Sequence, residues 1–230
     1  MPKLAIIGDF NPDSKSHQAT NAAIAHSSQL LKTSLSYEWI PTENIDENFK
    51  EIVQTYNGFW IAPGSPYKNM QAVLRIIEYA RLHSIPTLGT CGGFQHMTIE
   101  FVRNVLKVSD AQHAEYDPFA KNLVITPLTC QIKGHTLEIE IIDKSSKVFA
   151  IYRTEKILGK YYCSFGLESQ YQQAIENCGF KAVGIDNHKE VRILELKNHP
   201  FFIATLFMPQ DNSSEDQPNP LVTALAFSLK

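Results

Sequence analysis

The sequence predicts an α/β fold with an open, mainly parallel central sheet flanked by helices and a small antiparallel excursion, in a single domain spanning residues 1–230. Short apolar runs alternate with segments of helical apolar spacing through the first half, which is typical of a parallel sheet covered on both faces. In the second half, short strand candidates follow one another without long helices between them, which indicates antiparallel pairing. No repeat or linker divides the chain.

The first half contains four expected strands, each followed by an expected helix. Glycine or proline ends each strand, and apolar residues recur every three to four positions in the helices. The strands are expected at residues 4–7, 37–40, 59–62 and 85–88, and the helices at about 17–31, 45–56, 70–82 and directly after Cys91.

The second half is expected to contain more strands and fewer helices. A helix at 171–178 ends at Gly179, a residue typical of helix C-termini. The runs at 180–185 and 191–196 are spaced to form a hairpin around a polar turn. The remaining expected elements are strands at 123–125, 130–132, 137–142 and 201–207, a polar loop at 211–220 and a closing helix from about 221.

Composition excludes several classes of protein. The chain has 230 residues, of which 43% are hydrophobic and 20% charged, an ordinary globular mixture that argues against disorder. The net charge of −3 does not favour nucleic acid or an anionic membrane surface as a partner. No apolar run approaches the roughly 18 residues of a membrane span, and the N-terminus lacks a signal-peptide cleavage site. We therefore expect no nucleic-acid or membrane partner.

The four cysteines are widely spaced and form no CxxC pair. This arrangement suits a reducing compartment better than a disulfide framework, so we expect a cytoplasmic protein. No pair of histidines has metal-ligand spacing, and we predict neither a metal nor a cofactor. The cysteines are Cys91, Cys130, Cys163 and Cys178.

The most informative segment has the form G-x-C-x-G between an expected strand and helix. It is the cysteine version of a nucleophile elbow, in which a strained turn presents the nucleophile and glycines two residues to either side avoid collisions. A thiol at Cys91 would lie at a helix N-terminus, which favours the thiolate. The Gly92 amide is placed to donate to an oxyanion, and a second donor is expected in the Pro63-Gly64-Ser65 loop of the neighbouring strand.

A simpler interpretation of the same segment is structural. Cys91 could be a buried small hydrophobic residue, with glycines that merely permit close helix packing. The other three cysteines lie in strand-like apolar segments or late in a helix, and we expect them to be structural.

With these motifs, the sequence resembles the class I glutamine amidotransferase domains, and in particular the C-terminal glutaminase domain of CTP synthase. The resemblance implies a flavodoxin-like sheet, a Cys91 nucleophile that forms a glutamyl thioester, and an oxyanion loop at Gly64. It also implies that Gln95 and Glu115 hold glutamine, Glu115 through the α-amino group. The motifs that carry it are Ala62-Pro63-Gly64, Ile85-Pro86-Thr87-Leu88-Gly89-Thr90-Cys91-Gly92-Gly93-Phe94-Gln95, Ala111-Gln112-His113-Ala114-Glu115 and Asn198-His199-Pro200-Phe201-Phe202.

The pattern is incomplete where the family places its general base. Met208 and Gln210 stand where the resemblance expects a histidine and a glutamate, and neither can accept a proton from a thiol at neutral pH. Ser164 stands where an arginine would grip the glutamine α-carboxylate, and no arginine occurs between Arg153 and Arg192. The synthetase half that binds ATP and UTP in CTP synthase has no counterpart here, so the chain alone is not expected to make CTP.

Three hypotheses follow. The first is an enzyme that uses Cys91 on glutamine or a related amide, with His113 as the first candidate for a substitute base. The second is a catalytically impaired homologue that binds a small amino-bearing ligand or regulates a partner synthetase. The third keeps the thiol but changes the substrate to one without a free α-carboxylate. We expect His96 and His199 to be structural and the remaining histidines to face solvent: His17, His26, His83, His135 and His188.

Overall fold

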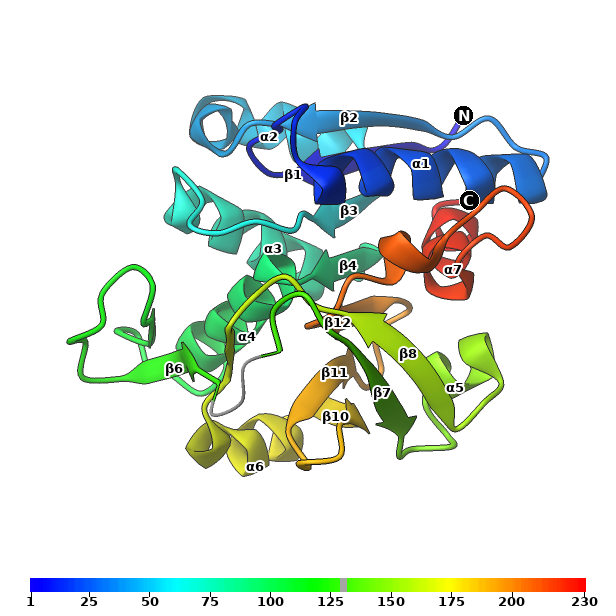
Figure 1. The fold of residues 1–230 in the computed structure, drawn as a ribbon. Coiled ribbons are helices and arrows are strands. Elements are labelled where there is room, and N and C mark those ends of the chain that lie inside the picture. Colours follow the sequence, from blue (N-terminus) through cyan, green and yellow to red (C-terminus); the bar gives the residue numbers. More distant parts are fainter. Residues whose placement is uncertain (129–131) are drawn as a thin grey trace.

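The computed structural model describes residues 1–128 and 132–230, and its centre is a nine-stranded sheet (Figure 1). Five neighbouring strands are parallel, and the other four continue the sheet in antiparallel fashion. In spatial order they are β2 (Ser36–Ile40), β1 (Lys3–Ile7), β3 (Gly58–Ile61), β4 (Thr87–Thr90), β12 (Phe202–Thr205), β11 (Val191–Leu196), β10 (Phe180–Ile185), β7 (Thr136–Ile141) and β8 (Lys156–Lys160).

Helices cover both faces of the sheet. On one face α1, α5 and α7 pack against one another, and on the other α2, α3, α4 and α6 form a continuous layer. Their bounds are α1 (Lys15–Leu30), α2 (Ile45–Thr55), α3 (Met70–Leu82), α4 (Gly92–Asn104), α5 (Lys147–Tyr152), α6 (Ser169–Asn177) and α7 (Pro220–Ser228), with short 3-10 turns η1 (Thr42–Asn44) and η2 (Pro209–Asn212).

A second, three-stranded sheet lies beside the C-terminal part of the first. It consists of β5 (Gln112–His113), β6 (Leu123–Pro127) and β9 (Phe165–Leu167), in the order β5-β6-β9. Strand β9 brings the segment that follows β8 back toward α4, with which it is in contact. This return places residues 160–165 near the start of α4.

The predicted α/β class and the mainly parallel central sheet are confirmed, but the antiparallel part is larger than the small excursion we expected. Four strands of the main sheet are antiparallel, and β8, β9 and α5 were not predicted. The expected strand at 130–132 lies largely outside the described residues. The expected hairpin is present as β10 and β11.

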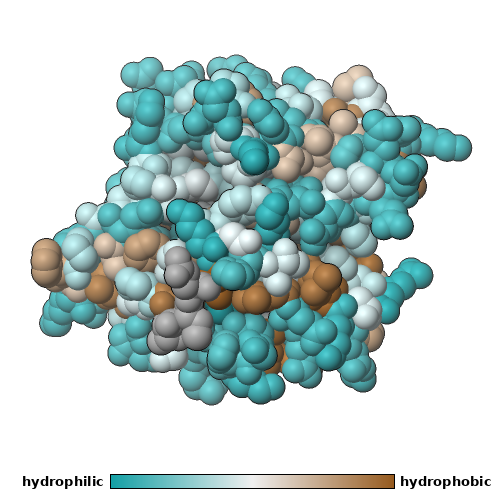
Figure 2. Space-filling model, in the orientation of Figure 1, coloured by the Kyte–Doolittle hydropathy of each residue, from teal (hydrophilic) through white to brown (hydrophobic). Residues whose placement is uncertain are grey.

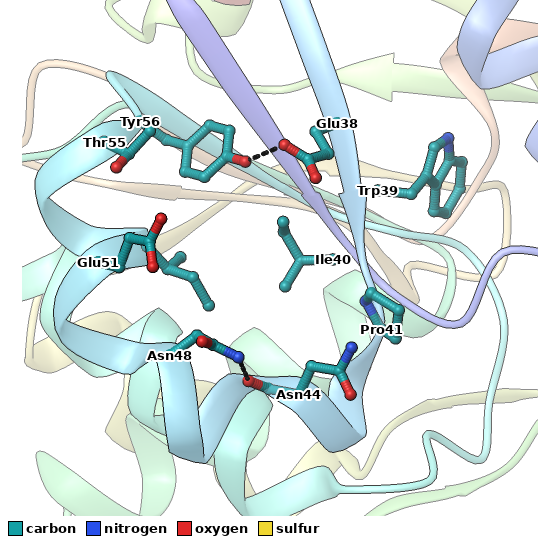
Figure 3. A pocket seen from close by; sticks show the side chains of 10 residues that line it. Glu38, Trp39, Ile40, Pro41, Asn44, Asn48, Glu51, Thr55 and Tyr56 are labelled. Atoms are coloured by element: carbon teal, nitrogen blue, oxygen red, sulfur yellow. Dashed lines mark hydrogen bonds between the residues drawn. The ribbon is translucent and has the colours of Figure 1, made fainter.

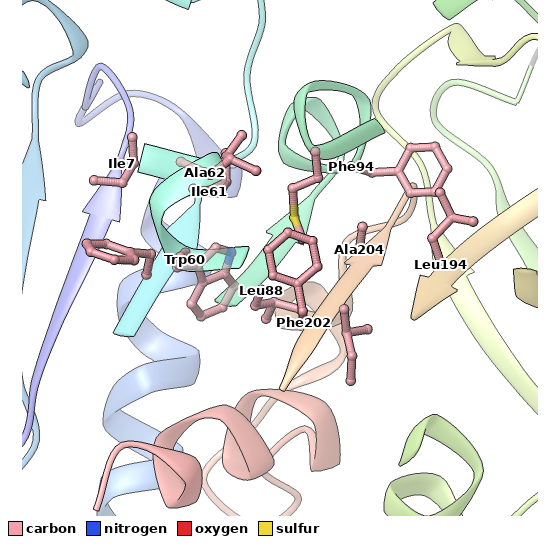
Figure 4. Close-up of a cluster of buried hydrophobic side chains, with 14 of the residues drawn as sticks. Ile7, Trp60, Ile61, Ala62, Leu88, Phe94, Leu194, Phe202 and Ala204 are labelled. Atoms are coloured by element: carbon pink, nitrogen blue, oxygen red, sulfur yellow. The ribbon is translucent and has the colours of Figure 1, made fainter. Parts of the chain in front are cut away.

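The hydrophobic core explains why the parallel strands are continuous apolar runs. Strands β3, β4 and β12 are buried along their whole length because helices cover both faces. Trp60, Leu88, Phe94 and Phe202 pack together at their centre (Figure 4). The face of the molecule shown in Figure 2 is mostly hydrophilic, with a band of hydrophobic residues in the region of β7 and β8, where Leu158 is 59% exposed.

Candidate active site

The turn between β4 and α4 has the geometry of a nucleophile elbow. Cys91 lies at the start of α4 with φ of 54° and ψ of −106°, a conformation that costs a non-glycine residue backbone strain. Its amide donates to the Thr205 carbonyl at 2.8 Å, which ties the turn to the end of β12. The strained turn expected from the sequence is therefore present.

Close backbone packing explains the glycines of the elbow. A Cβ atom at Gly89 would lie 2.8 Å from the carbonyl carbon of Gly93. One at Gly92 would lie 2.3 Å from the Gly64 carbonyl oxygen. Backbone atoms cannot move aside as a flexible side chain can, so these positions exclude a side chain.

Two backbone amides converge on the Cys91 sulfur. The backbone amides of Gly92, the next residue, and of Gly64, in the loop after β3, both act to lower the pKa of this thiol, against the larger raising effects of Cys163 and burial. Gly64 has φ of +108°, a left-handed conformation that favours glycine. The Gly64 loop also packs directly against Gly92, so the two predicted oxyanion donors lie beside one another at the elbow.

His17 holds the Gly64 loop in place. Its Nδ1 accepts from the Asn11 amide, so its Nε2 carries the proton and donates to the Pro63 carbonyl at 3.1 Å. The ring packs against Phe10 and Trp39, and the residue is only 7% exposed. The expectation that His17 faces solvent is wrong, because residues from three separate segments enclose it.

The other histidines expected to face solvent differ among themselves. His83, His135 and His188 are exposed, whereas His26 is half-buried and hydrogen-bonded to Ser213.

A second thiol lies at the elbow. Cys163, in the segment between β8 and β9, brings its side chain within interaction range of the Cys91 thiol. Together with burial, this interaction raises the pKa of Cys91, and it lowers the pKa of Cys163. The expectation that Cys163 is only structural misses this contact, which spans 72 positions of sequence. The one feature of the sequence that could have indicated it is that Cys163 directly precedes Ser164, at the expected position of the carboxylate anchor.

The predicted substrate-binding glutamine is engaged within the protein. Gln95 is fully buried, and its Nε2 donates to the Phe165 carbonyl at 3.1 Å. Its Oε1 accepts from His113 Nε2 at 3.2 Å. Glu115, by contrast, is exposed, so its carboxylate is open to a ligand.

His113 is held as a neutral ring. Its Nδ1 accepts from the Glu115 amide at 2.9 Å, so the proton lies on Nε2, which donates to Gln95. Burial, with the neighbouring His96, lowers the pKa of His113 to about 3. Both ring nitrogens are therefore occupied, and these bonds argue against His113 as a base for Cys91.

His96 and His199 make structural hydrogen bonds. His96 Nδ1 donates to the Gly92 carbonyl at 2.7 Å, and its Nε2 bonds the Tyr116 hydroxyl at 2.9 Å. Burial lowers the pKa of His96 to about 4. His199 links Ala80 to Phe201 through its two ring nitrogens.

Met208 and Gln210 are buried where the resemblance expects a base. Gln210 Nε2 donates to Thr20 Oγ1 at 3.1 Å and to Thr90 Oγ1 at 3.3 Å, and it contacts the Met208 sulfur at 3.8 Å. Gln210 Oε1 has no hydrogen-bond partner in the described residues. The pair therefore lies against the strand that leads into Cys91, but offers it no ionisable group.

Arg192 is not available as a carboxylate anchor at Ser164. Arg192, the first arginine after that position, is 1% exposed and forms an ion pair with Asp186 at 2.6 Å. It also pairs with Glu190 at 2.7 Å. These partners satisfy the guanidinium inside the protein.

Within residues 1–128 and 132–230, no group of three or more His, Cys, Asp and Glu side chains could hold a metal ion, and no helix has the length and apolarity of a membrane span. A cavity of about 230 Å³ lies between β2 and α2, remote from the elbow (Figure 3). In this cavity the Tyr56 hydroxyl donates a hydrogen bond to the Glu38 carboxylate.

The fold and the elbow define a class: α/β domains that present a cysteine at a strand-to-helix turn, beside the backbone of a neighbouring glycine loop. The family model for glutamine amidotransferase class-I matches residues 16–225. The chain belongs to this family.

Within this family, the chain is similar in sequence to curated CTP synthases. The CTP synthases of Cytophaga hutchinsonii and Saccharolobus solfataricus are 29% and 28% identical to it over 228 and 229 residues. The matches include 95% of this chain but only 42% and 43% of those enzymes, so the chain spans less than half of their length.

Solved structures agree on the fold. The glutaminase domain of Trypanosoma brucei CTPS with bound acivicin superposes with a TM-score of 0.91 at 18% identity, covering 100% of this chain and 94% of that one. A glutamine amidotransferase of Thermotoga maritima gives a TM-score of 0.63 at 11% identity, covering 99% and 96%. The chain is thus a CTP synthase-like class I glutamine amidotransferase domain.

Proposed function

We propose that Cys91 is an acyl-transfer nucleophile that acts on glutamine or a related amide. The observation that carries this proposal is the convergence of the Gly64 and Gly92 amides on the Cys91 sulfur. In acyl transfer the carbonyl oxygen becomes negatively charged as the sulfur adds, and preorganised amides stabilise that charge.

The proposed reaction has two steps. The Cys91 sulfur adds to the amide carbonyl carbon, the carbon–nitrogen bond breaks, and ammonia leaves with the thiol proton. Water then hydrolyses the thioester to the free acid and restores the thiol. Glu115, the exposed carboxylate at the site, is suited to bind the substrate amino group.

The triad of this site is incomplete, so we expect turnover to be slow. Met208 and Gln210 provide no general base, and burial together with the Cys163 interaction raises the pKa of Cys91. General acid–base catalysis contributes about 10²- to 10⁴-fold, and we expect ordinary glutaminase turnover to be reduced by a factor in that range. The missing arginine favours an amide without a free α-carboxylate.

The test is release of ammonia and acid from L-glutamine and from its carboxyl-blocked and decarboxylated analogues. We expect slow release by the wild-type protein, none by Cys91→Ala, and no change in Cys178→Ala, which alters an exposed cysteine. Release that persists in Cys91→Ala would overturn the proposal. If Cys91-dependent release is found, His113→Gln tests whether that ring contributes.

A second candidate function is favoured by the burial of Met208 and Gln210 and by the engagement of Gln95 within the protein. In this alternative, the chain is a catalytically impaired homologue that binds a small amino-bearing ligand at Glu115, or regulates a partner synthetase, without turnover. A thermal shift with glutamine but no product would support it. Ammonia release at a rate normal for a glutaminase would exclude it.

We place this activity in the cytoplasm. Cys91, Cys163 and Cys178 are all free thiols, which suits a reducing compartment. A synthetase is the kind of partner that the alternative would regulate, because the chain matches less than half of the length of the CTP synthases.

A further inference from the structure

The segment that follows β8 brings a second cysteine to the elbow. Cys163 Sγ donates to the Leu206 carbonyl at 3.7 Å, and the Cys91 amide donates to the Thr205 carbonyl at 2.8 Å. The Cys91 backbone and the Cys163 side chain therefore bond to the carbonyls of two consecutive residues, where β12 ends.

Hydrogen bonds from both sides fix this approach. One turn into α4, Gln95 donates to the carbonyl of Phe165, two residues beyond Cys163. On the other side of the segment, Leu128 donates to the Ser164 carbonyl at 2.8 Å. The backbone around Cys163 is thus fastened to the helix that begins at Cys91.

The two thiols differ in exposure and in acidity. Cys91 is 6% exposed, whereas Cys163 is half-buried. The interaction between the two side chains lowers the pKa of Cys163 and raises that of Cys91. A thiolate is the reactive form of cysteine, so Cys163 is the more accessible and the more readily ionised of the two.

We propose that Cys91 and Cys163 form a redox-active dithiol that closes to an intrachain disulfide when a hydroperoxide oxidises Cys163. No role has been assigned to Cys163 in amide cleavage, so this site lies beyond the proposed function.

The chemistry has two balanced steps. The Cys163 thiolate attacks the distal oxygen of the hydroperoxide, the oxygen–oxygen bond breaks, and protonation releases water from hydrogen peroxide or an alcohol from an organic hydroperoxide. This leaves a sulfenic acid at Cys163. The Cys91 sulfur then attacks the Cys163 sulfur, a disulfide forms, and the hydroxyl leaves as water with the Cys91 proton. Two electrons pass from the thiols to the peroxide, and a dithiol reductant reverses the change.

The disulfide would occupy the Cys91 sulfur and so block acyl transfer. This consequence makes the pair a reversible modification site at the elbow itself. Its detection does not depend on amide turnover, so the redox proposal and the proposed function can fail separately.

The test exposes the reduced full chain to hydrogen peroxide and maps its cysteines by mass spectrometry without reduction. We expect a linked peptide pair containing Cys91 and Cys163, which dithiothreitol reverses. The matched control Cys178→Ser should form the same link. In Cys91→Ser, where no resolving thiol remains, dimedone should trap a sulfenic acid at Cys163.

Rates provide the second measurement. In Cys91→Ser, where the serine hydroxyl can still donate to Cys163, we expect Cys163 to react with peroxide on the order of 10-fold faster than Cys178, an exposed thiol outside the elbow. Thermal melting verifies that each variant is folded. A link from either cysteine to Cys130 or Cys178 instead, or no link in the folded wild-type protein, would overturn the proposal.

Discussion

The two sides of the Cys91 site differ in that backbone atoms form one and side chains form the other. On the elbow side, backbone atoms make the site: a strained turn, two amides aimed at one sulfur, and glycines in contact with opposing carbonyls. On the opposite side, the side chains of Met208 and Gln210 stand where the family resemblance expects a base, and they are buried without an ionisable group. The fold itself fixes the first side, whereas two side chains decide the chemistry of the second.

This difference fits our proposal of an intact elbow beside an incomplete triad. Backbone donors belong to β4, α4 and the Gly64 loop, which also form the core, so altering them disturbs the fold. Met208 and Gln210 fill their space with neutral atoms, and Gln210 still bonds to Thr20 and Thr90. On this proposal, a site without the base still has a scaffold able to fold and keeps its thiol in place.

The largest effect should come from a side chain placed into the elbow. We expect Gly92→Ala to destabilise the protein by about 3 kcal/mol, because its Cβ would lie 2.3 Å from the Gly64 carbonyl oxygen. Urea unfolding measures the loss. Gly134→Ala is the matched control: it has φ of +85° but nothing within 4 Å of the added Cβ, so strain alone should cost about 1 kcal/mol. Equal losses would show that the elbow tolerates movement of its backbone.

The other side of the site is tested by restoring the base. In the double variant Met208→His, Gln210→Glu, we expect Cys91-dependent ammonia release from glutamine to rise about 10²-fold. The new carboxylate has a donor available, because Thr90 Oγ1 already accepts from Trp60 and can donate its own proton. The same pair of changes in a Cys91→Ala background should release nothing. A folded double variant with no gain would mean that the base is not what the site lacks.

The elbow could be predicted from the sequence because its signal is local. A glycine-flanked cysteine between an apolar run and a helical pattern specifies the turn, and the structure contains it with φ of 54°. The parallel strands were predictable for a similar reason, since burial on both faces produces continuous apolar runs.

Contacts between distant segments could not be predicted in this way. Cys163 reaches Cys91 only because β9 joins a separate sheet and returns the chain to α4. His17 lies on a helix whose pattern suggested exposure, but Phe10 and Trp39 enclose it. In both cases the environment comes from elements far apart in sequence, which single-segment patterns do not contain.

A smaller effect distinguishes the two sides by their response to acid. His96 and His113 both lie on the elbow side, and burial lowers their pKa values to about 4 and about 3. Below pH 6.5 the unfolded chain binds a proton at each, while the folded protein does not until those lower values. Stability is therefore full above pH 6.5 and is lost as the pH falls, by about a factor of ten in the folding equilibrium constant per histidine per pH unit.

Comparing wild type with His113→Gln isolates one of these two contributions. The variant removes one titrating ring. Between pH 6 and pH 4, its unfolding should therefore take up one proton fewer than that of the wild type, and its free energy of unfolding should fall less steeply with pH. The contributions of all other groups cancel in the difference. Urea midpoints at several pH values measure the two slopes. Parallel slopes would mean that His113 is protonated inside the folded protein, which requires its bond to the Glu115 amide to be broken. His113 would then again be a candidate for the base. A shallower slope means that the ring stays neutral and bound to Gln95, so that the elbow side supplies donors and no base.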